Sequence, residues 1–522
     1  MNFNEISKLL IPFALALATT MGLRYFFSRH EGAETIEMVR SGQRFVAPKS
    51  TEVEVHKPLN LEIDFSDAKN TKLPTITSFE TENAFYEFSS EGASLRRLEF
   101  RRNWGEKEGF LSTVFPPAGG DREKRCFLVA LEEKTPLSFE LVNHQEDDKT
   151  HTLTYRAPIE NGYLNKKFVV YKQDYRIDLE VGFEANGVIN QRARIFIPSP
   201  LVSELAGEDV VTVIANDERN KVKMYSRNAE TASSYWSHPT LFGAQDRYFI
   251  HALVNDPQQF TQRGYFKPVD LEMWYAILEG PDVTGNASWN LSFYMGPKED
   301  QAMAQVDARL EETLNYGMFS FISKPLSQLM LRALEAIYGV VHNYGWAIII
   351  LTILLKLLLL PFTWRGEQSL KKRMEFQKKL DHIQHKYKHD KEALAEARAE
   401  LIRKHGMPGM AGCIPLLLQL PIFWALSIIL SNAIQLYKAP FLWIPDLTAR
   451  DPYYILPILI FIGMVLHAPA GNDPKQRVSS IGMALVVAAV LSSFSSGLAL
   501  FTIVSTFLGV AQAQIMKVLK YD

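Results

Sequence analysis

The sequence has almost none of the residues that a disulfide framework or a metal centre needs. Its 522 residues include two cysteines, Cys126 and Cys413, and neither has the spacing partners of a metal site. A Gly-rich phosphate loop, a His-Glu-x-x-His zinc motif and a Gly-x-Ser-x-Gly elbow are also missing from the sequence. We therefore expect no structural disulfide, no metal, no cofactor, no nucleotide hydrolysis and no enzymatic activity.

The chain also lacks an excess of charge of either sign. A net charge of −2 gives no overall attraction to nucleic acid, so no direct nucleic-acid partner is expected. Apolar residues are distributed unevenly instead. The chain is polar and mixed up to about residue 330, and from Tyr344 onward long apolar runs recur with short polar gaps between them.

The apolar runs predict a protein that crosses a membrane several times. Residues 1–30 read as an uncleaved signal anchor, because the apolar run extends from Leu9 to Phe27. A cleavable signal peptide is the alternative, although its small-residue site at Ala14-Leu15-Ala16 would lie inside the run. Five further spans are predicted, which makes six in all, at 344–362, 412–436, 453–468, 478–495 and 497–517.

A large polar region separates the first span from the others. Residues 31–75 show no periodicity and suit an extended linker, whereas 76–320 alternate polar with apolar residues in short runs, as in Ile177 to Phe183. With turn signals such as Glu160-Asn161-Gly162, this pattern predicts one β-sandwich outside the membrane. Its histidines and carboxylates are scattered, so we expect solvated surface groups there.

Residues 322–341 have apolar side chains at helical spacing and predict an amphipathic helix. Because the segment leads directly into a span, we expect it on the membrane surface. The alternative is an ordinary helix that packs on the β-sandwich.

Orientation follows from the basic residues of the short connections. Segment 363–411 carries about a dozen Lys and Arg residues and is therefore predicted to be cytoplasmic. Both termini then lie in the cytoplasm, and the β domain and the 437–452 connector lie on the other side. Apolar positions within 363–411 predict a helical hairpin. Its charge suits either a solvated coiled-coil surface or a docking arm for nascent chain, ribosome or lipid headgroups.

The clearest functional signal is Lys356, which lies about midway along an otherwise apolar span. A charge at that depth costs roughly 2.5–3.5 kcal/mol, so such residues face water, a counter-ion or a cavity. No predicted span contains an interior carboxylate, which favours a water-filled groove over snorkelling to the membrane surface. Polar residues in the spans that could line this groove are Thr352, Gln419, Thr502, Ser505 and Thr506.

Two motifs resemble the YidC/Oxa/Alb insertase family. The first is AGCIPLLLQLPIF from Ala411 to Phe423, and the second is LWIPDL from Leu442 to Leu447, followed by DPYYILP from Asp451 to Pro457. With Ser496-Gly497-Leu498 opening the last span, the resemblance covers about 330–517. It implies a five-helix insertase core. A β domain after the first span is typical of bacterial members, and YEFSSEG from Tyr86 to Gly92 supports that weaker part of the match.

The resemblance assigns roles to residues of this chain. The family's intramembrane arginine falls on Lys356, its threonine on Thr352, its groove glutamine on Gln419, and its apolar slide on Leu420 and Phe423. Lysine keeps the charge but loses the bidentate fork of arginine.

Other positions depart from the family pattern. Phe501-Thr502 stands where two tyrosines are common, which weakens a substrate contact at Thr502. Lys378 replaces a common proline, and the chain carries no long basic tail.

The resemblance implies a bacterial inner-membrane protein that inserts and folds nascent integral membrane proteins, alone or with the Sec translocon. The hairpin is then the candidate contact for the translocon, the ribosome or signal recognition particle. Two alternatives stay open: a secondary transporter that binds an anion at Lys356, and a membrane-anchored carbohydrate-active or assembly protein that works through its β domain. We find no internal repeat of the kind that transporters show.

Overall fold

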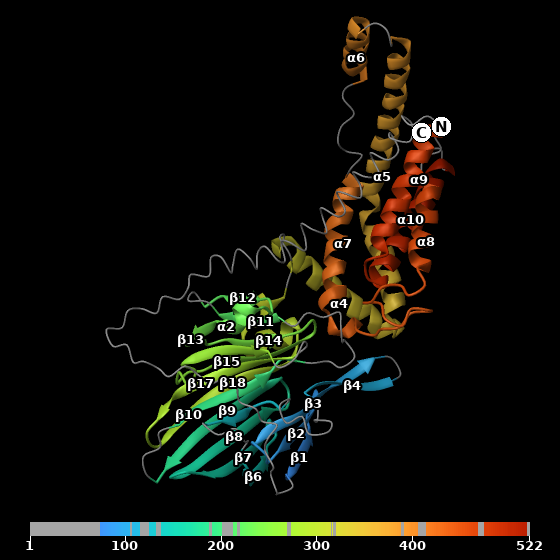
Figure 1. Cartoon of the computed structure of the whole chain (residues 1–522). Helices are drawn as coiled ribbons and strands as arrows, with labels where there is room; N and C mark the ends of the chain where they lie inside the picture. The colour runs from blue at the N-terminus through green and yellow to red at the C-terminus, as the bar shows by residue number, and fades with distance from the viewer. Residues whose placement is uncertain are drawn as a thin grey trace. The chain divides into compact units, whose positions relative to one another are not determined.

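The structure is a computed structural model. It describes residues 74–104, 107–114, 125–131, 137–186, 191–200, 212–216, 220–268, 273–314, 316, 320–387, 391–405, 414–467 and 474–518. The predicted anchor at 1–30 and nearly all of the predicted linker at 31–75 lie outside these residues. The chain divides into a β-rich unit, which ends at about residue 315, and a helical unit that follows it (Figure 1).

Three antiparallel sheets make up the β-rich unit. The four-stranded sheet has the order β1 (Ile76–Glu80), β2 (Ala84–Ser89), β3 (Ser94–Trp104), β4 (Lys107–Val114). The five-stranded sheet has the order β13 (Tyr235–Ser237), β16 (Arg263–Pro268), β17 (Trp274–Val283), β10 (Gln191–Pro198), β5 (Leu128–Ala130). The nine-stranded sheet has the order β12 (Val222–Tyr225), β11 (Thr212–Asn216), β14 (Phe242–Gln245), β15 (Phe249–Asn255), β18 (Ala287–Pro297), β9 (Arg176–Ala185), β8 (Gly162–Tyr171), β7 (Thr150–Ile159), β6 (Glu140–Glu146).

Aromatic side chains join the nine-stranded sheet to both smaller sheets. Phe88 of β2 lies 4.9 Å from Phe168 of β8, measured between ring centroids, and Phe242 of β14 stacks on Phe266 of β16 at 4.2 Å. Strand β7 alternates half-buried with buried residues, as expected for a sheet with one face in the core. The predicted β-rich domain is therefore confirmed, and its core lies between one large sheet and two smaller ones.

The predicted turn at Glu160–Gly162 joins β7 to β8, with Asn161 in a left-handed conformation at φ 61°. In the described part of this unit there are also three short helices, α2 (Ala229–Ser233), α3 (Asp300–Val306) and η4 (Ala308–Thr313). The last strand ends at Pro297, so the final part of the predicted sandwich range is helical and not extended.

The expectation that the histidines and carboxylates of this domain are solvated was wrong for several residues. His251 and Glu279 are fully buried, and His151 is nearly so. The reason is that β15 is covered on both faces, with residues 249–254 all buried, and His251 points toward the two smaller sheets. Lys166 is also buried, and its Nζ donates to the backbone carbonyls of Gly92, Ala93 and Phe127 at 2.6 to 2.9 Å.

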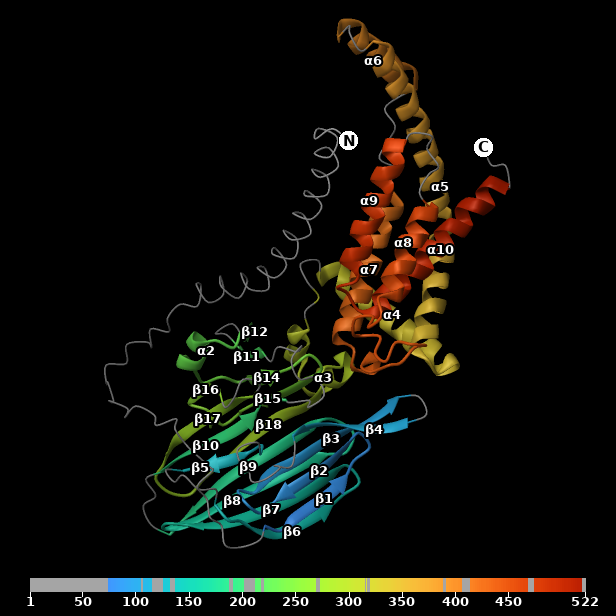
Figure 2. The ribbon, with the colours of Figure 1, turned by 45° about the vertical axis from the view of Figure 1, so that its right-hand side comes forward.

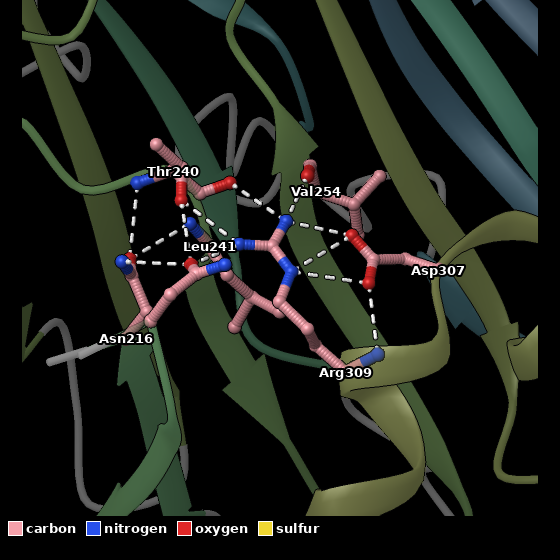
Figure 3. Close-up of polar contacts among 7 residues, drawn as sticks. Asn216, Thr240, Leu241, Val254, Asp307 and Arg309 are labelled. Atoms are coloured by element: carbon pink, nitrogen blue, oxygen red, sulfur yellow. Dashed lines mark hydrogen bonds and ion pairs between the residues drawn. The ribbon is translucent and has the colours of Figure 1, made fainter.

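Arg309 fixes the end of the β-rich unit to its sheet. Figure 3 shows its guanidinium between the carboxylate of Asp307 and the side chain of Thr240, with the carbonyl of Val254 as a further acceptor. Asn216 accepts hydrogen bonds from the backbone of Thr240 and Leu241 in the same cluster. Element η4 is therefore held against β15 and against Thr240, which precedes β14, by charge-assisted hydrogen bonds.

The helical unit contains α4 (Ser320–Val341), α5 (Tyr344–Lys386), α6 (Lys391–His405), α7 (Ile414–Asn432), η6 (Ile434–Leu436), α8 (Ile455–His467), α9 (Pro474–Leu491) and α10 (Ser496–Val518). Helix α10 packs against both α5 and α8, while α4 packs on α5 and α9 on α8. Figure 2 shows α10 among its neighbours and α6 beside the far end of α5.

The helix predicted at 322–341 is present as α4, and 363–411 contains a second helix, α6, as the hairpin requires. The predicted boundary at 362, however, does not end a helix. Helix α5 continues from Tyr344 to Lys386 and includes Pro361. A change from apolar to charged residues marks a membrane boundary and need not interrupt the backbone hydrogen bonds of a helix.

Among the described residues, two helical stretches are long and apolar enough to cross a bilayer, Tyr344–Pro361 and Ser496–Ile515. Shorter apolar stretches lie at Gln419–Asn432, Ile455–Leu466 and Ser480–Leu491. A bilayer core about 30 Å thick needs about 20 helical residues. The predicted total of six spans therefore stays a prediction.

Candidate functional site

Helix α5 carries Lys356 on the side that packs against other helices. The helix begins after Asn343, whose Oδ1 accepts hydrogen bonds from the backbone N–H groups of Gly345 and Trp346 at 2.9 and 3.2 Å. Ile348 and Thr352 are buried, and Lys356 continues their four-residue spacing as a half-buried side chain. The opposite side exposes three leucines, Leu354, Leu357 and Leu358.

The two threonines of the predicted site hydrogen-bond to their own helices. Thr352 donates to the carbonyl of Ile348 at 2.6 Å, and Thr502 of α10 donates to the carbonyl of Leu498 at 2.8 Å. Each hydroxyl oxygen still has acceptor capacity. In this structure the threonines thus place oxygen atoms, not free O–H donors, within the bundle.

Gln419 and Ser505 form a polar contact between two helices of the bundle. The Nε2 of Gln419 on α7 donates to the Oγ of Ser505 on α10 at 3.2 Å. Ser505 is buried, and Gln419 is half-buried. Hydrogen bonds between spans are worth on the order of 0.6 kcal/mol, so this pair can separate at small cost. The structure thus brings together two predicted site residues that are far apart in sequence.

The predicted apolar slide lies on α7. Leu420 is 54% exposed, whereas Phe423 is half-buried and its ring lies 6.0 Å from that of Phe494. Ala425 and Leu426 of the same helix are buried. Leu420 therefore offers apolar surface to the surroundings of the bundle, and Phe423 is partly covered by Phe494 in the turn between α9 and α10.

Sequence reasoning missed a polar cluster that closes one end of the bundle. The Oγ of Ser496 donates to the carbonyls of Asp446 and Ala449, and the backbone N–H of Gly497 donates to the carbonyl of Leu447 at 2.8 Å. Asp446 also lies in the motif that carries the family resemblance. The motif itself was the available signal, although it gave no indication of which atoms would meet.

A cluster of charged side chains lies on the five-stranded sheet. The carbohydrate-active alternative would require converging carboxylates in such a cluster. The buried carboxylate of Glu279 accepts from Arg192 at 2.6 Å and from Arg263 at 2.7 Å. Burial and the neighbouring Glu279 raise the pKa of the Tyr265 phenol above its usual value. The partners of this carboxylate are guanidinium groups and not a second carboxylate, so the cluster does not supply the pair of carboxyl groups that glycoside chemistry uses.

No group of three or more His, Cys, Asp and Glu side chains suited to a metal ion occurs among the residues that the structure describes.

Two family models match the chain. The model described as the 60Kd inner membrane protein matches residues 336–521, and the model described as the YidC periplasmic domain matches residues 78–329.

Three relatives called membrane protein insertase YidC are similar to the chain. The protein from Geotalea daltonii is 32% identical over 59% of this chain and 57% of its own length. The protein from Geotalea uraniireducens is 31% identical over 69% and 70%, and that from Syntrophobacter fumaroxidans is 31% identical over 70% and 71%. These alignments thus span between about half and seven tenths of the relatives.

Solved structures are similar to the chain at lower identity. A crystal structure of an active YidC insertase with the first transmembrane domain resolved is 17% identical, covering 88% of this chain and 95% of its own at a TM-score of 0.37. A galactose mutarotase related enzyme from Lactobacillus acidophilus is 7% identical, covering 42% of this chain and 97% of its own at a TM-score of 0.29.

Proposed function

Because the chain belongs to the YidC family of membrane protein insertases, we propose that it inserts integral membrane proteins into the bacterial inner membrane and helps them to fold. It is an inner-membrane protein with a periplasmic domain, as this family is. The observation that carries the proposal is the place of Lys356, half-buried on the bundle side of an otherwise apolar helical stretch. The named relatives are insertases and give no support to the transporter alternative.

The proposed route is a groove that opens to the cytoplasm and is lined by Lys356, Thr352, Gln419, Thr502 and Ser505. Water in the groove hydrates the ammonium group of Lys356, because an ammonium group in a dry apolar site would be costly. The charge attracts acidic groups in the hydrophilic segment of a client. That segment then crosses a shorter and wetter path than the full apolar core of the bilayer.

The polar side chains replace the water contacts that the client loses. The Gln419–Ser505 hydrogen bond supports this role, since opening it releases an amide and a hydroxyl toward a passing backbone. The threonine oxygens accept from client N–H groups without leaving their own helices. We therefore expect the groove to bind backbone and acidic side chains weakly and without sequence preference.

The apolar helix of the client leaves along the slide formed by Leu420 and Phe423. Exposure of Leu420 supports this exit. Burial of the client's apolar surface in lipid, at about 25 cal/mol per Å², drives the step without nucleotide hydrolysis.

The six-span topology, with both termini and the 363–411 hairpin in the cytoplasm, belongs to this proposal. So do contacts of the hairpin with the Sec translocon, the ribosome or signal recognition particle. The basic residues of the hairpin support the orientation.

The test is depletion of the protein in its own cell, followed by protease protection of newly made small membrane proteins with acidic translocated segments. We expect those segments to stay cytoplasmic, wild-type protein and Lys356→Arg to restore them, and Lys356→Ala and Lys356→Glu to fail. Leu357→Ala, on the exposed side of α5, is the matched control and should restore insertion fully. Normal insertion after depletion would refute the function, and full rescue by Lys356→Glu would refute the cationic groove.

A further inference from the structure

The connector between α7 and α8, residues 437–454, is a folded element and not a loose loop. Phe441 and Ile444 exchange two backbone hydrogen bonds of 2.9 Å, and the N–H of Leu447 donates to the carbonyl of Ala439 at 3.0 Å. Phe441, Ile444 and Leu447 are buried in the folded connector. Asp451 accepts from the indole of Trp443 at 3.2 Å, which fixes the second half of the segment.

The connector is fixed to the first turns of α5 and α10. Asn343 donates from its side chain to the carbonyl of Pro440 at 3.3 Å, and the backbone N–H of Ser496 donates to the carbonyl of Ala449 at 2.7 Å. The rings of Trp346 and Phe441 meet edge to face at 5.7 Å. These contacts hold the connector in one position relative to α5 and α10.

Leucine is an unfavourable residue type at position 442 if that position faces water. It is the first of two residues between the paired Phe441 and Ile444, and it adopts a left-handed φ of 52°. Glycine or asparagine is favoured in that conformation. The leucine side chain is also 73% exposed, so neither backbone geometry nor burial within the protein explains it.

Other exposed apolar residues adjoin this tip. Tyr453 and Tyr454 are 66% and 57% exposed, and Trp346, which contacts Phe441, is 53% exposed. Exposed leucines and isoleucines also occur on α5, which contacts the connector, and on α8, which follows it in sequence, at Leu354, Leu357, Ile455 and Ile458. The connector thus joins two helices that each expose apolar side chains, as expected of helices that face lipid in a membrane-embedded bundle.

The charges of the connector are arranged asymmetrically. Both acidic residues are satisfied internally, since Asp446 binds Thr448 and Asp451 binds the N–H of Leu456 at 2.7 Å. Both basic residues, Lys438 and Arg450, are exposed. The charge that the connector presents outward is therefore positive, which complements the phosphates of lipid headgroups.

We propose that the connector is an interfacial anchor that inserts Leu442 into the outer leaflet, with Tyr453 and Tyr454 at headgroup level. Tyrosine and tryptophan favour that depth, because one part of each ring system is apolar and the other is polar. Lys438 and Arg450 then lie near phosphate groups. The anchor rests on the membrane embedding of the bundle but needs no client protein, so it is separate from the insertase activity.

The test uses the full-length protein with Cys413→Ser in phospholipid nanodiscs, and a small environment-sensitive fluorophore on Leu442→Cys. Matched controls carry the fluorophore on Leu357→Cys, on the exposed side of α5, and on Val142→Cys, an exposed residue of the β-rich unit. The anchor predicts a blue-shifted emission at 442, strong quenching by doxyl-labelled lipid as at 357, and a several-fold smaller iodide quenching constant than at 142.

Iodide quenching at 442 equal to that at 142 would overturn the proposal, because the turn would then lie in water. Protection from both iodide and doxyl lipid would also overturn it, because a protein would then cover the turn. Protease resistance of each labelled variant shows whether the connector is folded, and the same measurements on Tyr453→Cys give a second position. Client insertion alone tests the insertase proposal, and fluorescence quenching alone tests the anchor, so the failure of one can be distinguished from the failure of the other.

Discussion

We expect acidification to destabilise the β-rich unit through one histidine. His251 is fully buried and bonds to two other sheets, its Nδ1 to the carbonyl of Pro198 at 3.0 Å and its Nε2 to the hydroxyl of Thr113 at 3.1 Å. A carbonyl only accepts, so we assign the proton to Nδ1, and Nε2 accepts from Thr113. Burial lowers the pKa of His251 to about 4.

The sign and size of the effect follow from linkage. In the unfolded chain the imidazole of His251 binds a proton below its ordinary pKa of 6.5. In the native state it stays neutral down to about pH 4. Stability is therefore fully present above pH 6.5, falls as pH decreases through this window, and becomes constant below it. The difference between the two pKa values, about 2.5, corresponds at about 1.4 kcal/mol per pH unit to a loss of about 3.5 kcal/mol.

The assay is native-state hydrogen exchange of β15 peptides in full-length protein between pH 7 and pH 4, corrected for intrinsic exchange rates. His251→Asn is the matched variant, because its amide still donates to Pro198 and it does not titrate. His151, whose pKa burial also lowers, and Glu146, whose pKa Lys172 lowers, titrate in both proteins and cancel in the comparison. An identical loss of stability in wild type and variant would refute the assignment to His251.

Three substitutions test other contacts. Lys166→Met removes the donor of three buried carbonyls and should cost about 1–3 kcal/mol in the urea unfolding of the β-rich unit; a cost near zero would contradict this. Arg309→Ala should cost about 2 kcal/mol in the same measurement and expose η4 to protease, whereas unchanged cleavage would count against the clamp. Gly345→Ala would place Cβ 2.0 Å from the Phe441 ring, so faster proteolysis of the connector is expected, and an unchanged rate would show that the ring can move.

Local patterns allowed the secondary structure to be predicted where neighbours in sequence decide it. Alternation along Ile177 to Phe183 gave β9, and the turn at Asn161 needed only a residue that tolerates positive φ. The end of the helix that contains Lys356 was not predictable in this way. The prediction placed that end where the sequence changes from apolar to polar, and polarity does not decide where a helix stops. Charged residues with good helix propensity continued α5 beyond the apolar stretch.

The site residues were predictable as chemical types but not as partners. Lys356 and Gln419 stand out because a polar side chain in an apolar run is costly. That Gln419 meets Ser505 depends on how α7 and α10 pack, which no local pattern contains. The burial of Lys166 has the same cause, since two of its three acceptors lie more than 70 residues away in sequence.

The continuity of α5 connects the proposed anchor to the proposed groove. Gly345 and Lys356 are eleven residues apart, close to three full turns, so they lie on nearly the same side of the helix about 16 Å apart along its axis. Phe441 packs so closely over Gly345 that no Cβ fits between them. Rotation of α5 that turned Lys356 toward lipid would therefore also pull Gly345 away from the connector. The connector thus limits the rotation of α5 and keeps Lys356 on the bundle side, although the connector lies at the end of α5 opposite to the opening of the proposed groove.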